Sequence, residues 1–343
     1  MPQLHNLKLL SKFLLLGALA SAVSIANAQP VIKIDGSSTV YPITKAAADK
    51  FEIAKKDTVK VSVDISGSGS GFKKFCLGEI DIVNASRPIM KHEMKHCKNS
   101  RVQYIEIPVA FDAITVAVNL ENSWSKRMTV AELKKIWEPA AQGKITKWNQ
   151  INPSWPDEAF KLYGADTNSG TYDYFTEAIV GKAKSSRNDF TKSENGNILV
   201  NNVAGNKNAL GFFGFADYIE NENRIQAVAV DNDRGKGAVL PSVETVENGS
   251  YQPLSRPIFI YVNIKAAEKT EIKQFVEFYL KNAILLVKEV RFFPLPPSAY
   301  ATMLEHFKNK RAGTVFNGMG MSAVGLTIDD LIRREGRLEY EHY

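Results

Sequence analysis

An α/β fold with two lobes is the fold class that this sequence predicts, and three observations support it. Short apolar segments alternate with amphipathic segments after residue 29, which favours strands and helices in turn with largely parallel pairing. The 343 residues exceed the usual length of one domain. Two long apolar segments, residues 102–119 and 255–264, bracket a central block and predict two strands that cross between lobes.

The first part of the chain repeats a strand, a glycine-rich turn and a helix. We expect strands at residues 31–35, 59–65 and 81–89, and helices at 44–56 and 72–79. Each strand either alternates apolar and polar residues or is apolar throughout, and each helix carries apolar residues at helical spacing. These segments, with the end of the chain, predict lobe I at residues 29–112 and 259–343.

The central block predicts lobe II at residues 113–258. Its expected elements are a helix at 128–139 with Thr129 as N-cap, a strand at 160–166, a turn and helix at 168–181 and a strand at 208–220. A long amphipathic helix at 271–290 follows the second crossover strand.

The first 28 residues have the layout of a cleaved signal peptide. Lys8 and Lys12 precede an apolar run at residues 13–26, and small residues end it before Gln29. The run is shorter than the roughly 20 residues that a membrane-spanning helix needs. We therefore expect a periplasmic protein, secreted by this cleaved peptide, whose mature chain is not inserted in a membrane.

The charge of the chain gives little support to nucleic-acid binding. The formal net charge is +6, and removal of Lys8 and Lys12 leaves a mild excess without a basic block. Aromatic and basic residues do not interleave as single-stranded nucleic acid requires. A mild positive field helps to attract a small anion but does not identify it.

Cys76 and Cys97 are the two cysteines of the sequence. In an exported protein such a pair is most simply a disulfide. The alternative is a metal site with His92 and His96, but Lys91, Lys95 and Lys98 would repel a cation there. We expect no metal and no cofactor.

Three stretches rich in hydroxyl groups and glycine each precede or open a predicted helix. They are residues 34–42, 66–75 and 165–175. The first turn of a helix carries unpaired N–H groups and the positive end of the helix dipole, so three such ends would together form an anion site. Helix capping explains each stretch taken singly.

Arg87 is the candidate cation for such a site. It follows a predicted strand and precedes Pro88, at the end of a strand where ligands of α/β proteins bind. An arginine can add a bidentate, charge-assisted pair to a bound oxyanion. The alternative is a surface ion pair.

Motifs of the common enzyme classes do not match. Phe72 stands where the dinucleotide-binding motif needs its last glycine, and the P-loop ending and the G-x-S-x-G nucleophile motif are missing. The residues around Asp231 break the calcium-loop pattern before its glycine. We expect a protein that is not an enzyme.

Five segments resemble the phosphate-binding protein of the high-affinity bacterial phosphate ABC transporter. They are GSSTVYP, SGSGSGF, DIVNASRPI, SGTYDYFTEAI and PLSRPIFIYV, and the resemblance covers essentially the whole mature chain. It implies a two-lobed periplasmic-binding-protein fold, type II-like, with phosphate in a cleft between lobes joined by two crossover strands. It also implies delivery of phosphate to a membrane permease by a receptor that we expect to be a monomer.

The resemblance implies phosphate ligands from all three stretches. Carried over by position, they are Ser38, Thr39 and the backbone of Val40, then Ser68, then Ser169, Gly170 and Thr171. Two positions depart from the family pattern. The family's Asp, which accepts the proton of monohydrogen phosphate, is replaced by Ser86, and its Arg before the third stretch by Gly164.

These departures leave alternatives open. Arg87 replaces the lost charge from the opposite lobe, as in the Ser-Arg-Pro branch of the family, and the substitute acceptor is Asp166 or a backbone carbonyl. A receptor for another tetrahedral oxyanion, such as sulfate or molybdate, is one alternative function. An exported phosphatase-like enzyme and a phosphate-sensing surface protein are the others.

Overall fold

The computed structural model describes residues 29–167, 169–233, 235, 237–318 and 326–336. Residues 31–343 form one compact unit, and the architecture below is that of its described part. The expected signal peptide at residues 1–28 lies outside the described residues. Among the helices described, none is long and apolar enough to cross a membrane.

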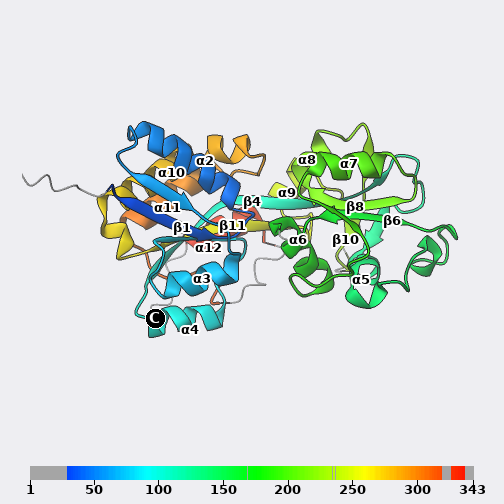
Figure 1. Cartoon of the computed structure of the whole chain (residues 1–343), viewed down its shortest axis with the longest axis horizontal. Helices are drawn as coiled ribbons and strands as arrows, with labels where there is room; N and C mark the ends of the chain where they lie inside the picture. Colours follow the sequence, from blue (N-terminus) through cyan, green and yellow to red (C-terminus); the bar gives the residue numbers. More distant parts are fainter. Residues whose placement is uncertain (1–28, 168, 234, 236, 319–325, 337–343) are drawn as a thin grey trace, which may run out of the picture. The chain divides into compact units, whose positions relative to one another are not determined.

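The first lobe is built on three parallel strands. β1 (Val31–Gly36) lies between β2 (Lys60–Val63) and β3 (Ile82–Ala85). The helices that follow these strands are α2 (Tyr41–Ala54), α3 (Ser68–Cys76) and α4 (Lys91–Asn99). The alternation of strand and helix predicted from the sequence is confirmed (Figure 1).

Two helices begin earlier than the sequence predicted. α2 begins at Tyr41 because Pro42, whose backbone angle suits a first helical turn, lies inside that turn. α3 begins at Ser68, so the serine–glycine run forms the first turn of the helix itself. Gly67 precedes it with φ +84°, a conformation that favours glycine.

One long strand belongs to both lobes. β4 (Tyr104–Asn119) pairs antiparallel with β11 (Ser255–Asn263) through Ala113, and with β8 (Ala209–Gly214) from Ile114 onward. All sixteen residues of β4 are buried, which agrees with its continuous apolar sequence. β11 also pairs with β3, so that β4 and β11 connect the sheets of the two lobes. The lobe boundaries given above stay a prediction.

The second lobe continues the same sheet beyond β8. β6 (Lys161–Ala165) pairs parallel with β8 and with β7 (Thr191–Ser193), and β9 (Ile225–Ala227) pairs with β4. A separate pair joins β5 (Arg127–Thr129) to β10 (Ala229–Asp231). The helices are α5 (Val130–Trp137), α6 (Gly170–Phe175), which continues as a π-helical turn to Val180, α7 (Gly196–Ala204), α8 (Phe215–Ile219) and α9 (Val243–Glu247).

Local details of this lobe test two predictions. Thr129 caps α5, since its hydroxyl accepts from the Glu132 N–H at 3.0 Å, as predicted. The strand expected at 208–220 is wrong in its second half, where the chain turns into α8 after Gly214. The apolar residues of α8 fit the spacing of a helix as well as that of a strand, and periodicity cannot distinguish the two in so short a segment.

The end of the chain returns to the first lobe. α10 (Thr270–Glu289) packs against α2, and α11 (Pro297–Lys308) and α12 (Ile328–Gly336) follow it. Short 3₁₀ turns lie at Pro139–Ala141, Trp148–Gln150 and Ala266–Glu268.

Cys76 at the end of α3 and Cys97 in α4 form a disulfide, which confirms the predicted pairing.

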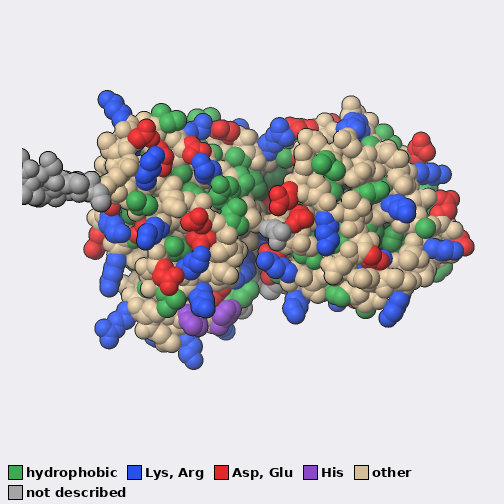
Figure 2. Space-filling view, viewed as in Figure 1, with side chains coloured by type: hydrophobic (Ala, Val, Ile, Leu, Met, Phe, Trp, Pro, Cys, Tyr) green, Lys and Arg blue, Asp and Glu red, His purple; other side chains and the backbone are tan. Residues whose placement is uncertain are grey.

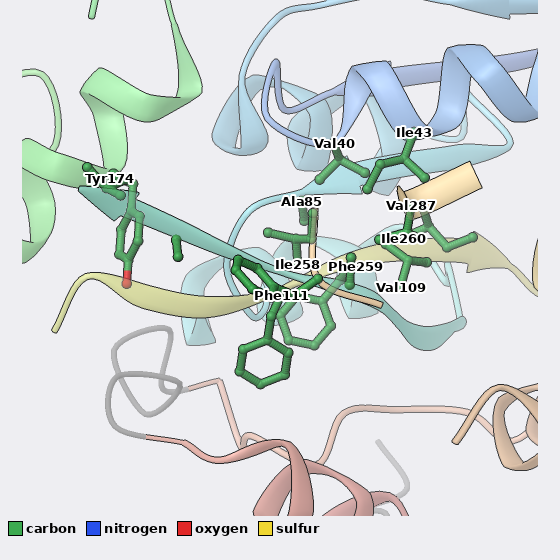
Figure 3. Packing of buried hydrophobic residues seen from close by; sticks show 14 of the residues in the cluster. Val40, Ile43, Ala85, Val109, Phe111, Tyr174, Ile258, Phe259, Ile260 and Val287 are labelled. Atoms are coloured by element: carbon green, nitrogen blue, oxygen red, sulfur yellow. The ribbon is translucent and has the colours of Figure 1, made fainter. Parts of the chain in front are cut away.

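Apolar side chains of the crossover strands fill the centre of the first lobe. Phe111 of β4 lies beside Ile258 and Phe259 of β11, with Val40, just before α2, and Ile43 of α2 nearby (Figure 3). These residues are fully buried. The start of α2 is therefore held on the same core as both crossover strands.

A buried carboxyl lies in this lobe beneath the C-terminal helix. Glu106 of β4 accepts hydrogen bonds from the Tyr261 hydroxyl at 2.6 Å, the Thr314 hydroxyl at 2.5 Å and the Val315 N–H at 3.0 Å. Burial, and then the carboxylate of Glu335 in α12, raises the pKa of Glu106 to about 8.

We expect this carboxyl to make stability depend on pH. Between pH 4.5 and about 8 the folded state holds a proton that the unfolded state has lost, so the free energy of unfolding falls as pH rises. The slope from one group is at most about 1.4 kcal/mol per pH unit. Urea unfolding across this range should show a smaller slope in Glu106→Gln than in the exposed control Glu121→Gln. Equal slopes would contradict the assignment.

Candidate functional site

The first two hydroxyl-rich stretches meet at the carboxyl end of β1. Ser38 and Thr39 lead from β1 into α2, and the N–H groups of Ser66 and Gly67 donate to the Gly36 carbonyl at 3.0 and 2.8 Å. Neither α2 nor α3 receives a hydrogen bond from a capping side chain. Helix capping therefore does not account for the hydroxyl groups of these two stretches.

Ser68 and Ser86 tie α3 to the end of β3. The Ser86 N–H donates to the Ser68 hydroxyl at 3.0 Å, and the two hydroxyl oxygens lie 3.1 Å apart. Ser86 is buried and Ser68 is half-buried. The first turn of α3 is fixed in this way to the end of β3.

The third stretch brings the start of α6 against the start of α2. A Cβ atom added to Gly170 would lie 2.7 Å from the Thr39 backbone nitrogen and would overlap its hydroxyl. Only glycine allows this contact between the two helix ends. Ser169 caps α6, since its hydroxyl accepts from the Tyr172 N–H at 3.1 Å.

A buried arginine on β11 reaches the same contact. Arg256 is 4% exposed, and its Nη2 lies 3.5 Å from the Gly170 carbonyl oxygen. Its guanidinium carbon lies 3.7 Å from the centre of the Tyr174 ring. Tyr174 extends from α6 towards the crossover strands (Figure 3), and its hydroxyl donates to the Pro253 carbonyl at 2.5 Å.

Asp112 of β4 lies directly opposite Arg256 in the antiparallel pairing. Its Oδ2 is 3.8 Å from Arg256 Nε, and both side chains are less than a tenth exposed. Burial raises the pKa of Asp112, and the nearby Arg256 charge opposes that rise. Burial likewise lowers the pKa of Arg256, and the Asp112 charge opposes that change.

Three polar atoms around Gly170 are buried without hydrogen-bond partners among the described residues. They are the Thr39 hydroxyl oxygen, Arg256 Nε and Asp112 Oδ2. A buried polar group left unpaired costs about 1–3 kcal/mol. The three come from the turn before α2, from β11 and from β4 and lie around one contact, so a polar ligand that pairs with them removes this cost.

Comparison with known proteins identifies the family. The PBP superfamily domain matches residues 23–283. Protein SphX of Synechocystis is 50% identical over 327 residues, covering 95% of both chains. The phosphate-binding protein PstS of Staphylococcus saprophyticus is 35% identical over 303 residues, covering 87% of this chain and 91% of PstS.

The chain belongs to the PstS and SphX family.

A solved structure supports the same assignment. A possible phosphate-binding protein from Planctomyces limnophilus is 45% identical with a TM-score of 0.77, over 82% of this chain and 99% of that one. The predicted fold class, a two-lobed periplasmic-binding-protein fold, is confirmed. The contact around Gly170 is the candidate ligand site because buried polar atoms without hydrogen-bond partners lie around it.

Arg87, the cation singled out from the sequence, is already paired within the first lobe. Its two terminal nitrogens donate to the Glu93 carboxylate at 2.9 and 2.7 Å, and one also donates to the Pro88 carbonyl. Glu93 also accepts from the Met90 N–H at the start of α4. Arg87 thus forms an ion pair, which was the alternative given above for this residue. The pair is not at the surface, because the side chains of Arg87 and Glu93 are both largely buried.

The remaining candidates lie around the start of α6. Thr171 is in its first turn and is half-buried. The Asp166 backbone bridges two neighbours, as its N–H donates to the Ser193 carbonyl and its carbonyl accepts from Ser169. The ligand roles predicted for Ser38, Thr39, Val40, Ser68, Ser86, Arg87, Asp166, Ser169, Gly170 and Thr171 stay predictions.

Sequence reasoning missed Arg256 and Asp112. A signal for Arg256 was present, because Ser255-Arg256-Pro257 repeats the Ser86-Arg87-Pro88 tripeptide. Asp112 was hidden in an apolar strand, where one acidic residue is unusual because burying a charge is costly. Which of two arginines reaches the helix ends depends on strand pairing, which the sequence does not give.

The histidines and cysteines stay apart from this site. His92 and His96 are exposed on α4 among lysines, and Figure 2 shows this histidine patch bordered by basic side chains. Within the described residues, no group of three or more His, Cys, Asp or Glu could hold a metal ion.

The two kinds of hydroxyl should behave differently on mutation. Ser169→Ala removes a helix cap and should lower the free energy of unfolding by about 1 kcal/mol. Ser38→Ala, which removes a hydroxyl that caps no helix, should leave it unchanged within experimental error. Urea denaturation of both variants makes the comparison, and an equal loss in Ser38→Ala would contradict it.

Proposed function

We propose that this protein is an exported receptor that binds inorganic phosphate and delivers it to a membrane ABC transporter without chemical change. The observation that carries the proposal is the group of buried polar atoms without hydrogen-bond partners around the contact between Thr39 and Gly170. The relatives named as phosphate-binding proteins support it. The periplasmic location, cleaved signal peptide and monomeric state remain part of the proposal.

The chemistry of the site suits a small oxyanion. A dianion leaves water only if donors satisfy its oxygen lone pairs. The first turns of α2, α3 and α6 offer backbone N–H groups and hydroxyls in fixed positions, together with the positive ends of their dipoles. The Arg256 guanidinium adds a charged donor that is already desolvated.

Several observations favour binding over catalysis. Hydrolysis of a phosphate ester needs an activated nucleophile, a metal or a general base close to the anion. The Ser169 hydroxyl is occupied as a helix cap. His306 is on α11 beside Glu335, and His92 and His96 are on the exposed face of α4.

Isothermal titration calorimetry with inorganic phosphate tests the proposal directly. We expect binding at micromolar concentration or below and no turnover of p-nitrophenyl phosphate by the same preparation. The absence of phosphate binding at micromolar concentration would overturn the receptor function. Steady release of p-nitrophenol would favour the enzyme instead.

The two arginines allow a matched comparison. Arg256→Lys retains the positive charge but loses the planar fork of donors, and should weaken phosphate binding at least about tenfold. Arg87→Lys makes the same change at a guanidinium held by Glu93, and should weaken binding less. Complete removal, Arg256→Ala, should cost about 2–5 kcal/mol, or roughly 30- to 4,000-fold in affinity.

Calorimetry on the lysine variants decides between the two positions. A larger loss in Arg87→Lys than in Arg256→Lys would show that Arg87, and not Arg256, supplies the cation of the site. Circular dichroism and urea unfolding of each variant verify that the protein remains folded.

A further inference from the structure

Helix α4 has an exposed face that is basic and carries no carboxylate. The cationic and histidine side chains exposed along it and just after it are Lys91, His92, Lys95, His96, Lys98 and Arg101. The one acidic residue of α4, Glu93, is buried and paired with Arg87. Figure 2 shows basic side chains around the histidine patch of this helix.

The charges on α4 are arranged differently from those on α2 and α10. Lys45 of α2 and Lys281 of α10 each pair with a carboxylate four positions away. No acidic residue stands three or four positions from Lys91 or Lys95; these two lysines are themselves four apart, and Lys98 is three beyond Lys95. Like charges at this spacing destabilise a helix. The stability of α4 therefore does not explain its basic face, whereas an anionic partner does.

A cavity of about 430 Å³ adjoins the end of this helix. Its apolar lining includes Met94, Cys97, Val102, Tyr104 and Ala312. Lys98, Arg101 and Lys265 add three cations, and none of the described lining residues is acidic. A cavity of this size and composition suits the head of an amphipathic anion, whose charge meets the cations and whose carbon atoms meet the apolar lining.

The abundance of lysine favours a charged surface over a folded protein or a free inorganic anion as the partner. Protein interfaces are depleted in lysine, and most of their binding energy comes from arginine and aromatic residues. Exposed lysines stay hydrated, so they lack the desolvated donors that a small anion needs to leave water. An anionic membrane attracts each lysine near its surface by charge alone.

We propose that the exposed face of α4 and the adjoining cavity form a docking surface for an anionic phospholipid membrane, with a lipid phosphate in the cavity. The inference goes beyond the proposed receptor function, because it concerns where the protein is held and not which ion it carries. Docking at a membrane would keep the receptor close to the transporter that it is proposed to serve.

Flotation with lipid vesicles tests the docking surface. Phosphatidylcholine vesicles with roughly a quarter phosphatidylglycerol should carry the full chain, and vesicles of phosphatidylcholine alone should not. A lysine at an anionic surface contributes about fivefold to binding, so the double variant Lys91→Gln, Lys95→Gln should bind roughly 25-fold more weakly. The control is Lys134→Gln, Lys144→Gln, which removes two exposed charges from the second lobe and should bind as the unmodified protein does.

The cavity is tested by a substitution that the backbone favours. Arg101 has φ +56°, a conformation that glycine adopts without strain, so Arg101→Gly should stay folded. It should weaken binding to the anionic vesicles about fivefold. Lys56→Gly makes the same change at φ +50° beyond the end of α2 and should leave vesicle binding unchanged. Unchanged binding in Arg101→Gly would overturn the assignment of the cavity.

Three results would overturn the docking surface as a whole. They are no flotation with the anionic vesicles, equal flotation with neutral ones, and an equal loss in the two double variants. No flotation would point to an acidic protein instead, and calorimetric binding of glycerol 3-phosphate that Arg101→Gly abolishes would then point to a free organic phosphate. Calorimetry with inorganic phosphate should give the same affinity in Lys91→Gln, Lys95→Gln as in the unmodified protein, so a failure of docking is distinguishable from a failure of the receptor function.

Discussion

The antiparallel pairing of β4 with β11 determines most of what lies around the candidate site. These two strands lie in the middle of the nine-stranded sheet, between β3 and β8, and β4 continues into the second lobe, where it pairs with β8 and β9. Their register places Asp112 opposite Arg256 near the point where β4 changes partners. A shift of one residue in this register would place Asp112 and Arg256 on opposite faces of the sheet.

The positions of the helix ends depend in turn on the pairing of β4 with β11. α2 starts on the core formed by the crossover strands, and α6 is anchored to β11 by the Tyr174 hydroxyl. Gly170 and Thr39 can then touch, with Arg256 alongside. The site therefore combines neutral donors from helix ends with one buried pair of opposite charges.

That charge pair lies beside the contact between Gly170 and Thr39. Arg256 supplies a desolvated positive charge, and the carboxylate of Asp112 on the neighbouring strand lies beside it. Arg87, by contrast, is neutralised by Glu93 and helps to fix the start of α4. The two Ser-Arg-Pro tripeptides have the same sequence, but their arginines have different roles because Arg87 pairs with Glu93 and Arg256 lies beside Asp112.

The sequence by itself determined the α/β class, the crossover segments, the disulfide pair and the three stretches that begin helices, because these follow from local periodicity, composition and turn chemistry. Only the tertiary structure decided which polar groups meet. Asp112 and Arg256 are 144 positions apart, and Thr39 and Gly170 are 131 apart, so their proximity comes from strand register and helix packing. Those are long-range properties of the fold, which no local pattern of residues contains.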